Sequence, residues 1–358
     1  MRRMHNEIIS SKGLKRRNFL KISGGLVFGS MFLPFSSIAK DFSRLKEIKR
    51  SAFTMGSIVT FTAYHVDERL CITAIDEAIK EMKLIDTLMS VYNPNSQLSS
   101  INNQWSHASG NSHNNGIAVD VRIIEILNHA KQFSELTNGA FDITVEPLMK
   151  LYGFRDDGSL HPFPSDKIMT QTLDAVGMDK VVFNNRDRIV RVEHPLTRLD
   201  FGGIAVGYAI DQCVSIFKKH GIESALINHS GDIYAIGTPP GAEYWEIGIV
   251  DPLHPEHIIT SVNIKNQALS TSGNYENFIE KEGKRIGHIL NPKLGKPSST
   301  ILSGTTIAPT AIEADAFSTG MFVMGLERSQ KLIKTLGNVE CIGIINNGNG
   351  ERIHHFRS

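Results

Sequence analysis

Three oxygen-bearing side chains lie close together in one apolar stretch near the end of the chain. Asp315, Ser318 and Thr319 fall within residues 309–325, PTAIEADAFSTGMFVMG, which are otherwise mostly small and apolar. The stretch reads as a helix, and residues four apart share a helix face, so the Asp315 carboxylate and the Thr319 hydroxyl point the same way. Mg²⁺ prefers a carboxylate plus neutral oxygens, with phosphate completing its shell. The alternative is a buried helix whose polar groups are satisfied by hydrogen bonds.

Two glycine-rich turns each follow a predicted strand. Gly202-Gly203 precedes a helix that we expect to begin near Ala205, and Ser272-Gly273 follows a short extended segment. Glycine lets backbone N–H groups approach an anion closely, and a helix start adds a favourable dipole. Neither turn has the GxGxxG or GxxxxGK[ST] pattern, so the Rossmann and P-loop interpretations both lack their motif. The turns are candidate phosphate-binding loops, and the alternative is two ordinary tight turns.

The bulk composition is that of a soluble globular protein. The chain has 358 residues, 41% of them hydrophobic, and a formal net charge of +1, which suits one large domain or two ordinary ones. This charge balance gives no support to a nucleic-acid partner, which usually shows as a basic patch. Cys71, Cys213 and Cys341 are odd in number and lack CxxC spacing. We expect them to be small core residues, with neither a zinc site nor a disulfide framework.

The N-terminus has the pattern of an export signal. Residues 15–21, KRRNFLK, precede a glycine-containing apolar run at 22–35, and Ser37 and Ala39 are small residues at the two positions that a signal peptidase reads. The paired arginines resemble a twin-arginine signal. The apolar run is short for a membrane anchor, which needs about 20 residues. We therefore expect residues 1–39 to be removed and the protein to be periplasmic, with membrane association only if the signal is not cleaved.

The remaining chain, residues 40–358, alternates between helical and extended patterns. Apolar spacing predicts helices over residues 68–91, 120–137, about 205–220 and 309–325. It predicts strands over residues 53–64, 224–228, 245–250 and 340–345, the last strand of the chain, and short strands within residues 180–199 separated by a turn at Asn184-Asn185. No internal repeat or low-complexity linker divides this part. We predict an α+β protein with a single mixed α/β domain.

Eight motifs, in order, resemble those of the ApbE family of FAD:protein FMN transferases. They are MGS at Met55, SVYNPNSQLSSIN at Ser90, GAFDITVEPL at Gly139, LDFGGIAVGYAID at Leu199, SGDIYAIG at Ser230, LSTSGNYENF at Leu269, HILNPKLGKP at His288 and IEADAFSTGMFVMG at Ile312. They cover essentially all of the mature chain. The resemblance implies an ApbE-like topology, FAD bound as the substrate in an elongated cleft, and Mg²⁺ bridging its pyrophosphate.

The resemblance also implies which residues form the cleft. The family's metal ligands fall on Asp315 and Thr319, with Ser318 beside them and a backbone carbonyl at Gly203. The flavin-contacting positions match Met55, Tyr92, Ala140, Phe141, Asp142 and Asp200. The turn at Ser272 and Gly273 and the segment of His288 and Ile289 complete the cleft.

The implied reaction is phosphoryl transfer. A threonine or serine hydroxyl of an acceptor flavoprotein attacks the FMN-side phosphorus of FAD, AMP leaves, and FMN becomes joined by a phosphoester. Because charge on the phosphates dominates the barrier, a bridging cation and oriented N–H donors would supply most of the stabilisation. The hydroxyl needs a base near neutral pH, and His288 is our candidate. The alternative is a histidine that is only hydrogen-bonded beside the cleft.

Four positions depart from the family pattern. Val206 stands where many relatives carry lysine or another polar residue, and Leu294 replaces the usual threonine. Ser230 and Asn274 replace a commoner glycine and aspartate. These departures keep two other functions open, a Mg²⁺-dependent FAD pyrophosphatase and a non-catalytic flavin-binding assembly factor. The export signal resembles that of the accessory group linked to nitrous oxide reduction, so the expected acceptor is a membrane-bound electron-transfer protein.

Overall fold

The computed structural model describes most of the chain that follows the expected export signal. The described residues are 45–105, 116–155, 163–275, 277–281, 284–346 and 351–358. The signal expected over residues 1–39 lies outside them. Within the described part of the chain, no helix has the length and apolar character needed to cross a membrane.

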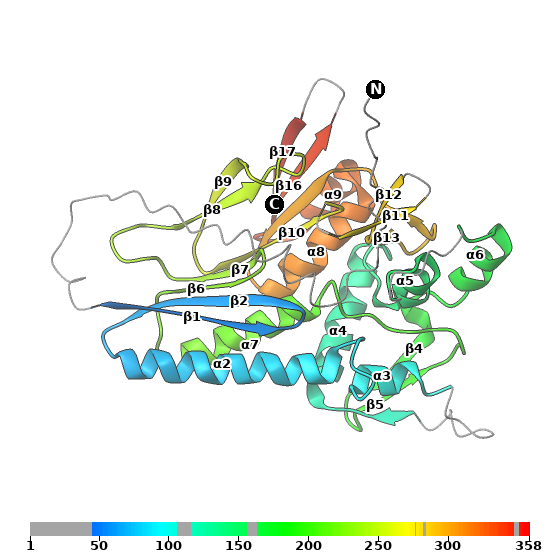
Figure 1. Ribbon diagram of the computed structural model, residues 1–358, viewed down its shortest axis with the longest axis horizontal. Helices are drawn as coiled ribbons and strands as arrows, with labels where there is room; N and C mark the ends of the chain where they lie inside the picture. Colours follow the sequence, from blue (N-terminus) through cyan, green and yellow to red (C-terminus); the bar gives the residue numbers. More distant parts are fainter. Residues whose placement is uncertain (1–44, 106–115, 156–162, 276, 282–283, 347–350) are drawn as a thin grey trace, which may run out of the picture.

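The largest sheet has eight strands and runs through the centre of the molecule (Figure 1). Its order is β1-β2-β6-β7-β10-β15-β16-β17, and every neighbouring pair is antiparallel. The strands are β1 (Lys46–Thr54), β2 (Ser57–His65), β6 (Ala225–His229), β7 (Asp232–Ile236), β10 (Gln267–Gly273), β15 (Ser303–Ala308), β16 (Glu340–Asn346) and β17 (Glu351–Arg357). Strands from the two ends of the described chain therefore form the two edges.

Helices and small sheets complete the described chain. The helical segments are α2 (Glu68–Met89), α3 (Gln97–Asn102), α4 (Val121–Leu136), η4 (Ile143–Val145), α5 (Glu146–Tyr152), α6 (Asp166–Leu173), η5 (Met178–Lys180), α7 (Ala205–Lys219), α8 (Ala311–Met324) and α9 (Leu326–Ile333). The small sheets are β3 (Ile117–Ala118) with β5 (Ile189–Val192) and β4 (Val181–Asn184), β8 (Trp245–Val250) with β9 (Ile258–Ile264), β11 (Phe278–Lys281) with β12 (Lys284–Gly287), and β13 (Leu290–Asn291) with β14 (Lys296–Pro297). In Figure 1, α3, α4, α5, α6, β4 and β5 gather at one end of the molecule.

Helices α2, α7 and α8 cover one face of the large sheet. They pack against its strands and against one another. In α2 the buried positions recur every three or four residues, as at Cys71, Ile75, Met82 and Ile85, which is the stripe of an amphipathic helix. Helix α8 is instead buried on nearly all sides, because it lies among α7, β10 and β15. Its even apolar character in the sequence follows from this central position.

The β8–β9 hairpin covers the opposite face of the sheet. Trp245 and Ile247 of β8 pack with Ile233, Leu269 and Ile307, which lie side by side on β7, β10 and β15. The next residues along these strands face the helices, because side chains alternate between the two faces of a strand. The middle of the sheet is therefore buried on both faces, and this packing holds β10 and β15, the strands that contact α8, in position.

Most predicted elements are confirmed. The helices predicted over residues 68–91, 120–137 and 205–220 are α2, α4 and α7. The Asp120 side chain accepts a hydrogen bond from the Arg122 N–H and so caps α4. All three cysteines are free and buried, as expected of core residues. An α+β fold is confirmed.

Two predictions about strands are wrong. Residues 53–64 do not form one strand, because Met55 and Gly56 make a tight turn between β1 and β2, with φ values of 49° and 82°. Two residues at positive φ form the hairpin turn whose twist matches that of the strands. The strand predicted over residues 340–345 is not the last, because β17 follows it and pairs with β16.

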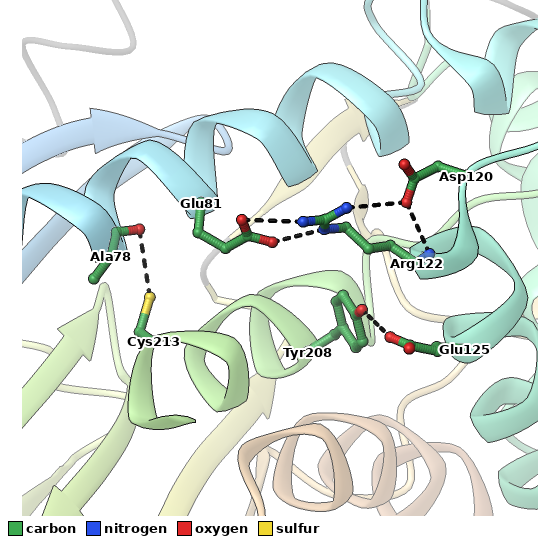
Figure 2. A network of polar contacts seen from close by, with 7 residues as sticks. All are labelled: Ala78, Glu81, Asp120, Arg122, Glu125, Tyr208 and Cys213. Carbon is green, nitrogen blue, oxygen red and sulfur yellow. Dashed lines mark hydrogen bonds and ion pairs between the residues drawn. The ribbon is translucent and has the colours of Figure 1, made fainter. Parts of the chain in front are cut away.

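A polar network joins α4 to α2 and α7 (Figure 2). The Arg122 guanidinium donates to both oxygens of Glu81, at 2.6 and 3.2 Å, and to Asp120 at 3.1 Å. The Tyr208 hydroxyl of α7 donates to Glu125 of α4. A bidentate arginine–carboxylate pair adds both geometry and energy. This network fixes the start of α4 relative to the helices beneath the sheet.

We expect Gly207→Ala to lower the free energy of unfolding by at least about 2 kcal/mol, because the added methyl group would enter the backbone of α8. A Cβ at this position would lie 2.7 Å from the carbonyl carbon of Ala311 and 2.8 Å from Ile312 Cα. Gly337→Ala is the control, since nothing lies within 4 Å of a Cβ there. Urea unfolding measures both variants, and equal stability would contradict so close an approach of α7 to α8.

Candidate metal and flavin site

Helix α8 is held at its N-terminus by two polar side chains. Thr310 accepts a hydrogen bond from the Glu313 N–H and caps the helix. Asp211, near the middle of α7, accepts from the N–H groups of Ala311 and Ile312 at 2.8 and 2.9 Å. A carboxylate at a helix start also meets the positive end of the helix dipole. These contacts fix where the oxygens of α8 lie against the sheet.

The Asp315 carboxyl is buried inside the protein. Asp315 is only 6% exposed, and its Oδ2 accepts a hydrogen bond from the Gly207 N–H at 3.0 Å. Burial, followed by the charge of Asp232, raises the pKa of Asp315 well above its usual range. Among the described residues, no lysine or arginine forms an ion pair with it. A buried carboxylate of this kind is unfavourable until a positive charge is brought beside it.

Hydroxyl groups surround the next turn of α8. The Ser318 hydroxyl lies 2.9 Å from that of Ser272 and 3.2 Å from that of Ser270, and it donates to the Asp315 carbonyl at 2.9 Å. The Thr319 hydroxyl lies 3.3 Å from the Ser272 hydroxyl. Ser318 is thus engaged by three neighbours, whereas Thr319 has the weaker contact. Of the two, Thr319 has the hydroxyl more available to a ligand.

The glycine turn before α7 approaches these oxygens. A Cβ on Gly203 would lie 3.1 Å from Thr319 Oγ1 and 3.5 Å from the Phe141 ring. Only glycine leaves this space open, so backbone can come close to a group held there. The structure therefore brings together Gly203, Asp315, Ser318 and Thr319, the four residues expected to form the metal site.

The donor set suits a hard cation such as Mg²⁺. No group of three His, Cys, Asp or Glu side chains in the described part of the chain could hold a metal ion. A metal in this region would depend on one carboxylate and neutral oxygens, completed by the ligand itself, which is how Mg²⁺ is often bound next to phosphates. The Asp315 carboxyl, whose pKa is raised by burial, is the group whose charged form such an ion would stabilise.

Tyr92 and Asp200 form the other part of the site. The Tyr92 ring is 70% exposed and lies beside Arg155, whose Cζ is 5.3 Å from the ring centroid. Arg155 donates to the Tyr92 hydroxyl at 2.8 Å and pairs with Asp200. Asp200 also accepts from the Gly202 N–H at 2.8 Å. An exposed aromatic ring held in this way is suited to stack on a flat ligand.

The turn at 139–142 is shaped by its own hydrogen bonds. The Phe141 N–H donates to the Thr137 hydroxyl at 3.0 Å. Asp142 accepts from both the N–H and the hydroxyl of Thr144, at 2.9 and 2.6 Å, and caps η4. Ala140 N–H donates to the Thr137 carbonyl at 3.2 Å. Asp142 is therefore occupied in holding the turn, and the Phe141 ring packs next to Gly203.

His288 follows strand β12 and is held by one backbone carbonyl. Its Nδ1 lies 3.0 Å from the Asn277 oxygen. A carbonyl can only accept, so Nδ1 carries the proton and the neutral ring leaves a lone pair on Nε2. Burial lowers the pKa of His288. The ring is therefore neutral near pH 7, in the form that can accept a proton.

The three remaining predicted flavin-site residues are Met55, Gly273 and Ile289, and each has different contacts. The Met55 N–H donates to Asp86 at 2.8 Å, which places this half-buried residue at the β1–β2 turn. Gly273 closes β10 and lies against the Tyr275 ring, which a Cβ would displace. Ile289 is buried in the main core. These three residues act here through packing and backbone contacts.

The positions that depart from the family pattern have plain structural roles. Val206 packs against the main core from the first turn of α7. Leu294 is 61% exposed. Asn274 donates to the Ser298 carbonyl at 2.6 Å. Ser230 lies at positive φ in the β6–β7 turn.

Three charged residues of the site gave no usable signal in the sequence. Asp211 and Asp232 lie in motifs but have no spacing that links them to Asp315, and Arg155 begins a polar segment. They meet their partners only through tertiary packing. Their positions within the motifs gave no indication that Asp211 and Asp232 act on α8.

Comparison with known proteins gives consistent matches. The model of the ApbE family matches residues 55–343. The FAD:protein FMN transferase of Salmonella typhimurium is 28% identical over 288 residues, covering 79% of this chain and 80% of that protein. The protein of the same name from Haemophilus influenzae is 28% identical over 342 residues, covering 92% and 94%. The crystal structure of the ApbE protein from Thermotoga maritima has a TM-score of 0.76 at 29% identity, covering 87% of this chain and 97% of that one. The expected ApbE-like topology is confirmed.

We expect Asp211 to make stability fall as pH rises. Burial raises its pKa from the ordinary value of 3.8 to about 6, so the folded protein keeps a proton that the unfolded chain has already lost. The free energy of unfolding should therefore drop by about 2 kcal/mol from this group between pH 4 and pH 6.

Urea unfolding at pH 4, 5, 6 and 7 tests this expectation. The difference in stability between the wild type and Asp211→Asn should decline over that range, because the asparagine does not titrate. Asp174→Asn, on an exposed residue after α6, is the control. A difference that is flat with pH, or that grows with it, would contradict the role of Asp211.

Proposed function

This chain belongs to the ApbE family, whose model matches residues 55–343, and we propose that it is an FAD:protein FMN transferase. The curated relatives bear this name. The observation that carries the proposal is the buried Asp315 carboxyl, which has no cationic partner among the described residues. It stands one helical turn before Thr319, whose hydroxyl lies close to Gly203. A site of this kind fits a cation bound to a pyrophosphate.

Asp315 and Thr319, with Ser318 beside them and the Gly203 carbonyl, would hold Mg²⁺. The ion would supply neutralisation of charge on the FAD pyrophosphate, the main obstacle to phosphoryl transfer. The Gly203 N–H would lie near the phosphates, where glycine allows close approach, while the Gly202 N–H is already bonded to Asp200. Tyr92 and Asp200 would bind the flavin end, with Phe141 and Ala140 forming the wall of the cleft.

His288 would act as the general base. Its Nε2 lone pair is free to take the proton of an acceptor threonine or serine hydroxyl, because Nδ1–H is committed to Asn277. The hydroxyl oxygen then forms a bond to the FMN-side phosphorus, and the bond from that phosphorus to the bridging oxygen of AMP breaks. The products are an FMN phosphoester on the acceptor and free AMP.

We propose that the acceptor is a membrane-bound electron-transfer flavoprotein met in the periplasm. This proposal rests on the twin-arginine pattern of residues 15–21. Periplasmic removal of residues 1–39 would leave every residue of the proposed site in the mature protein.

We expect Asp315→Asn to reduce FMN transfer at least about 100-fold, because the isosteric amide keeps the shape and removes the charge that attracts the cation. The purified mature chain is incubated with FAD, Mg²⁺ and a bacterial flavoprotein domain that carries an acceptor threonine. In-gel flavin fluorescence reports transfer, and chromatography reports AMP and free FMN. Glu313→Gln, on the same helix, is the matched control.

The products also separate the alternatives. Labelled acceptor with AMP supports the transferase, free FMN with AMP supports a pyrophosphatase, and neither product supports a flavin-binding assembly factor. A fully active Asp315→Asn variant would remove the proposed metal site.

We expect His288→Gln to slow transfer about 100-fold or more while the Kd for FAD stays within about twofold. In the wild type the rate should rise with pH as the imidazole loses its proton, and this rise should be absent from the variant. Because burial lowers the pKa of His288, the midpoint of this increase in the wild-type rate should lie below pH 6.5. An unchanged rate profile in the variant would place the base elsewhere.

A further inference from the structure

Arg155 reaches the flavin end of the site from a sharp change of chain direction. Helix α5 ends at Tyr152 and is capped by Gly153, whose φ of 90° only glycine adopts readily. Phe154 packs with the cluster formed by Leu148 and Tyr152. The Arg155 side chain therefore reaches Tyr92 and Asp200 from a fixed position at the end of α5.

The guanidinium joins two predicted flavin-contacting residues. It donates to the Tyr92 hydroxyl, lies near the Tyr92 ring and pairs with the Asp200 carboxylate. The Arg155 and Asp200 side chains are only 14% and 12% exposed, although the Tyr92 ring is open to solvent. An arginine bound to a carboxylate in a shielded place holds both groups in one geometry.

One N–H of the guanidinium has no acceptor. Arg155 Nε is buried and lacks a hydrogen-bond partner in the described part of the chain. A buried donor without a partner is costly, so such groups are usually completed by something else. An isoalloxazine ring offers carbonyl oxygens and ring nitrogens that accept hydrogen bonds.

The same pair reaches toward the phosphate end. Asp200 accepts from the Gly202 N–H with the oxygen that Arg155 does not use. Gly202 leads directly to Gly203, which lies against Thr319 and Phe141. Fixing Asp200 therefore fixes the start of the turn that would meet the pyrophosphate.

On the premise of the proposed function, we propose that Arg155 organises the flavin end of the cleft. Its guanidinium holds Tyr92 and Asp200 in one arrangement, and its remaining Nε–H donates to the bound flavin.

Charge gives this arrangement a second effect that can be measured. The charged groups that act on His288 in the described chain are Asp200, which favours the imidazolium, and Arg155, which disfavours it. Glu146 of α5 acts in turn on the Arg155–Asp200 pair. Removing the guanidinium should therefore raise the pKa of His288, an effect that a purely structural contact would not produce.

Three variants test the proposal. Arg155→Met removes both the charge and the donors while keeping much of the side-chain length. Arg155→Lys keeps the charge but cannot bond Tyr92, Asp200 and the flavin together. Arg198→Met is the matched control, because Arg198 also acts on Glu146 but its guanidinium donates to the carbonyls of Pro195 and Thr197.

Binding of FAD alone to the full mature chain, followed by quenching of flavin fluorescence, is the first measurement. We expect the Kd to rise about tenfold in Arg155→Met and in Arg155→Lys, as for loss of a hydrogen bond to a charged group. Arg198→Met should bind like the wild type. Unfolding curves confirm that each variant is folded.

Titration of His288 by NMR is the second measurement, with His288→Gln assigning its ring signals. The pKa should rise in Arg155→Met and stay near the wild-type value in Arg155→Lys and Arg198→Met. Wild-type affinity and an unmoved His288 titration in Arg155→Met would overturn the proposal. Both readouts are independent of FMN transfer, so a chain that binds FAD but transfers no FMN would contradict the transferase proposal and leave the role of Arg155 intact. A wild type that transfers FMN, with an unchanged Kd and His288 pKa in Arg155→Met, would contradict only the role of Arg155.

Discussion

A carboxylate buried without a cation beside it is the constraint on which this structure depends. Asp315 lies on a helix packed on nearly all sides, and a second carboxylate, Asp232, raises the cost of its charge. The charged form of Asp315 is therefore unfavourable where no cation lies beside it, and a divalent ion would make that form favourable. In the proposed function, this carboxyl would favour a ligand that brings both phosphate and metal.

Close packing of backbone makes this burial possible. Gly207 lets α7 approach α8 so nearly that its own N–H reaches the Asp315 carboxylate. Asp211, one turn further along α7, holds the first N–H groups of α8. One helix therefore sets both the position and the electrostatics of the other. The hydroxyls on β10 complete the surroundings from the sheet.

The regular elements were easier to predict from the sequence than the contacts of the site. Apolar spacing located α2 and α4, because a single buried stripe decides such helices. Alternation failed at Met55 and Gly56, since both flanking strands follow the same pattern and only the turn geometry separates them. The family motifs predicted that the oxygens of α8 lie near the Gly203 turn, as Thr319 does in the structure. Arg155 could not be found, because its partners Tyr92 and Asp200 are 63 and 45 residues away and only the end of α5 aims it at them.

The strand order of the large sheet means that the candidate site can form only late in synthesis. Strand β2 takes β6 as its second neighbour, with Thr60 opposite Asn228, and β10 and β15 emerge later still. Strands that are distant in sequence pair slowly, because the entropy of closing a long loop is lost before the stabilising contacts form. While the ribosome has released only the first half of the chain, β2 has an open side and the oxygens of α8 have not been made. In the proposed function, a nascent chain of this length would offer FAD no binding site, and FAD binding would require the finished polypeptide.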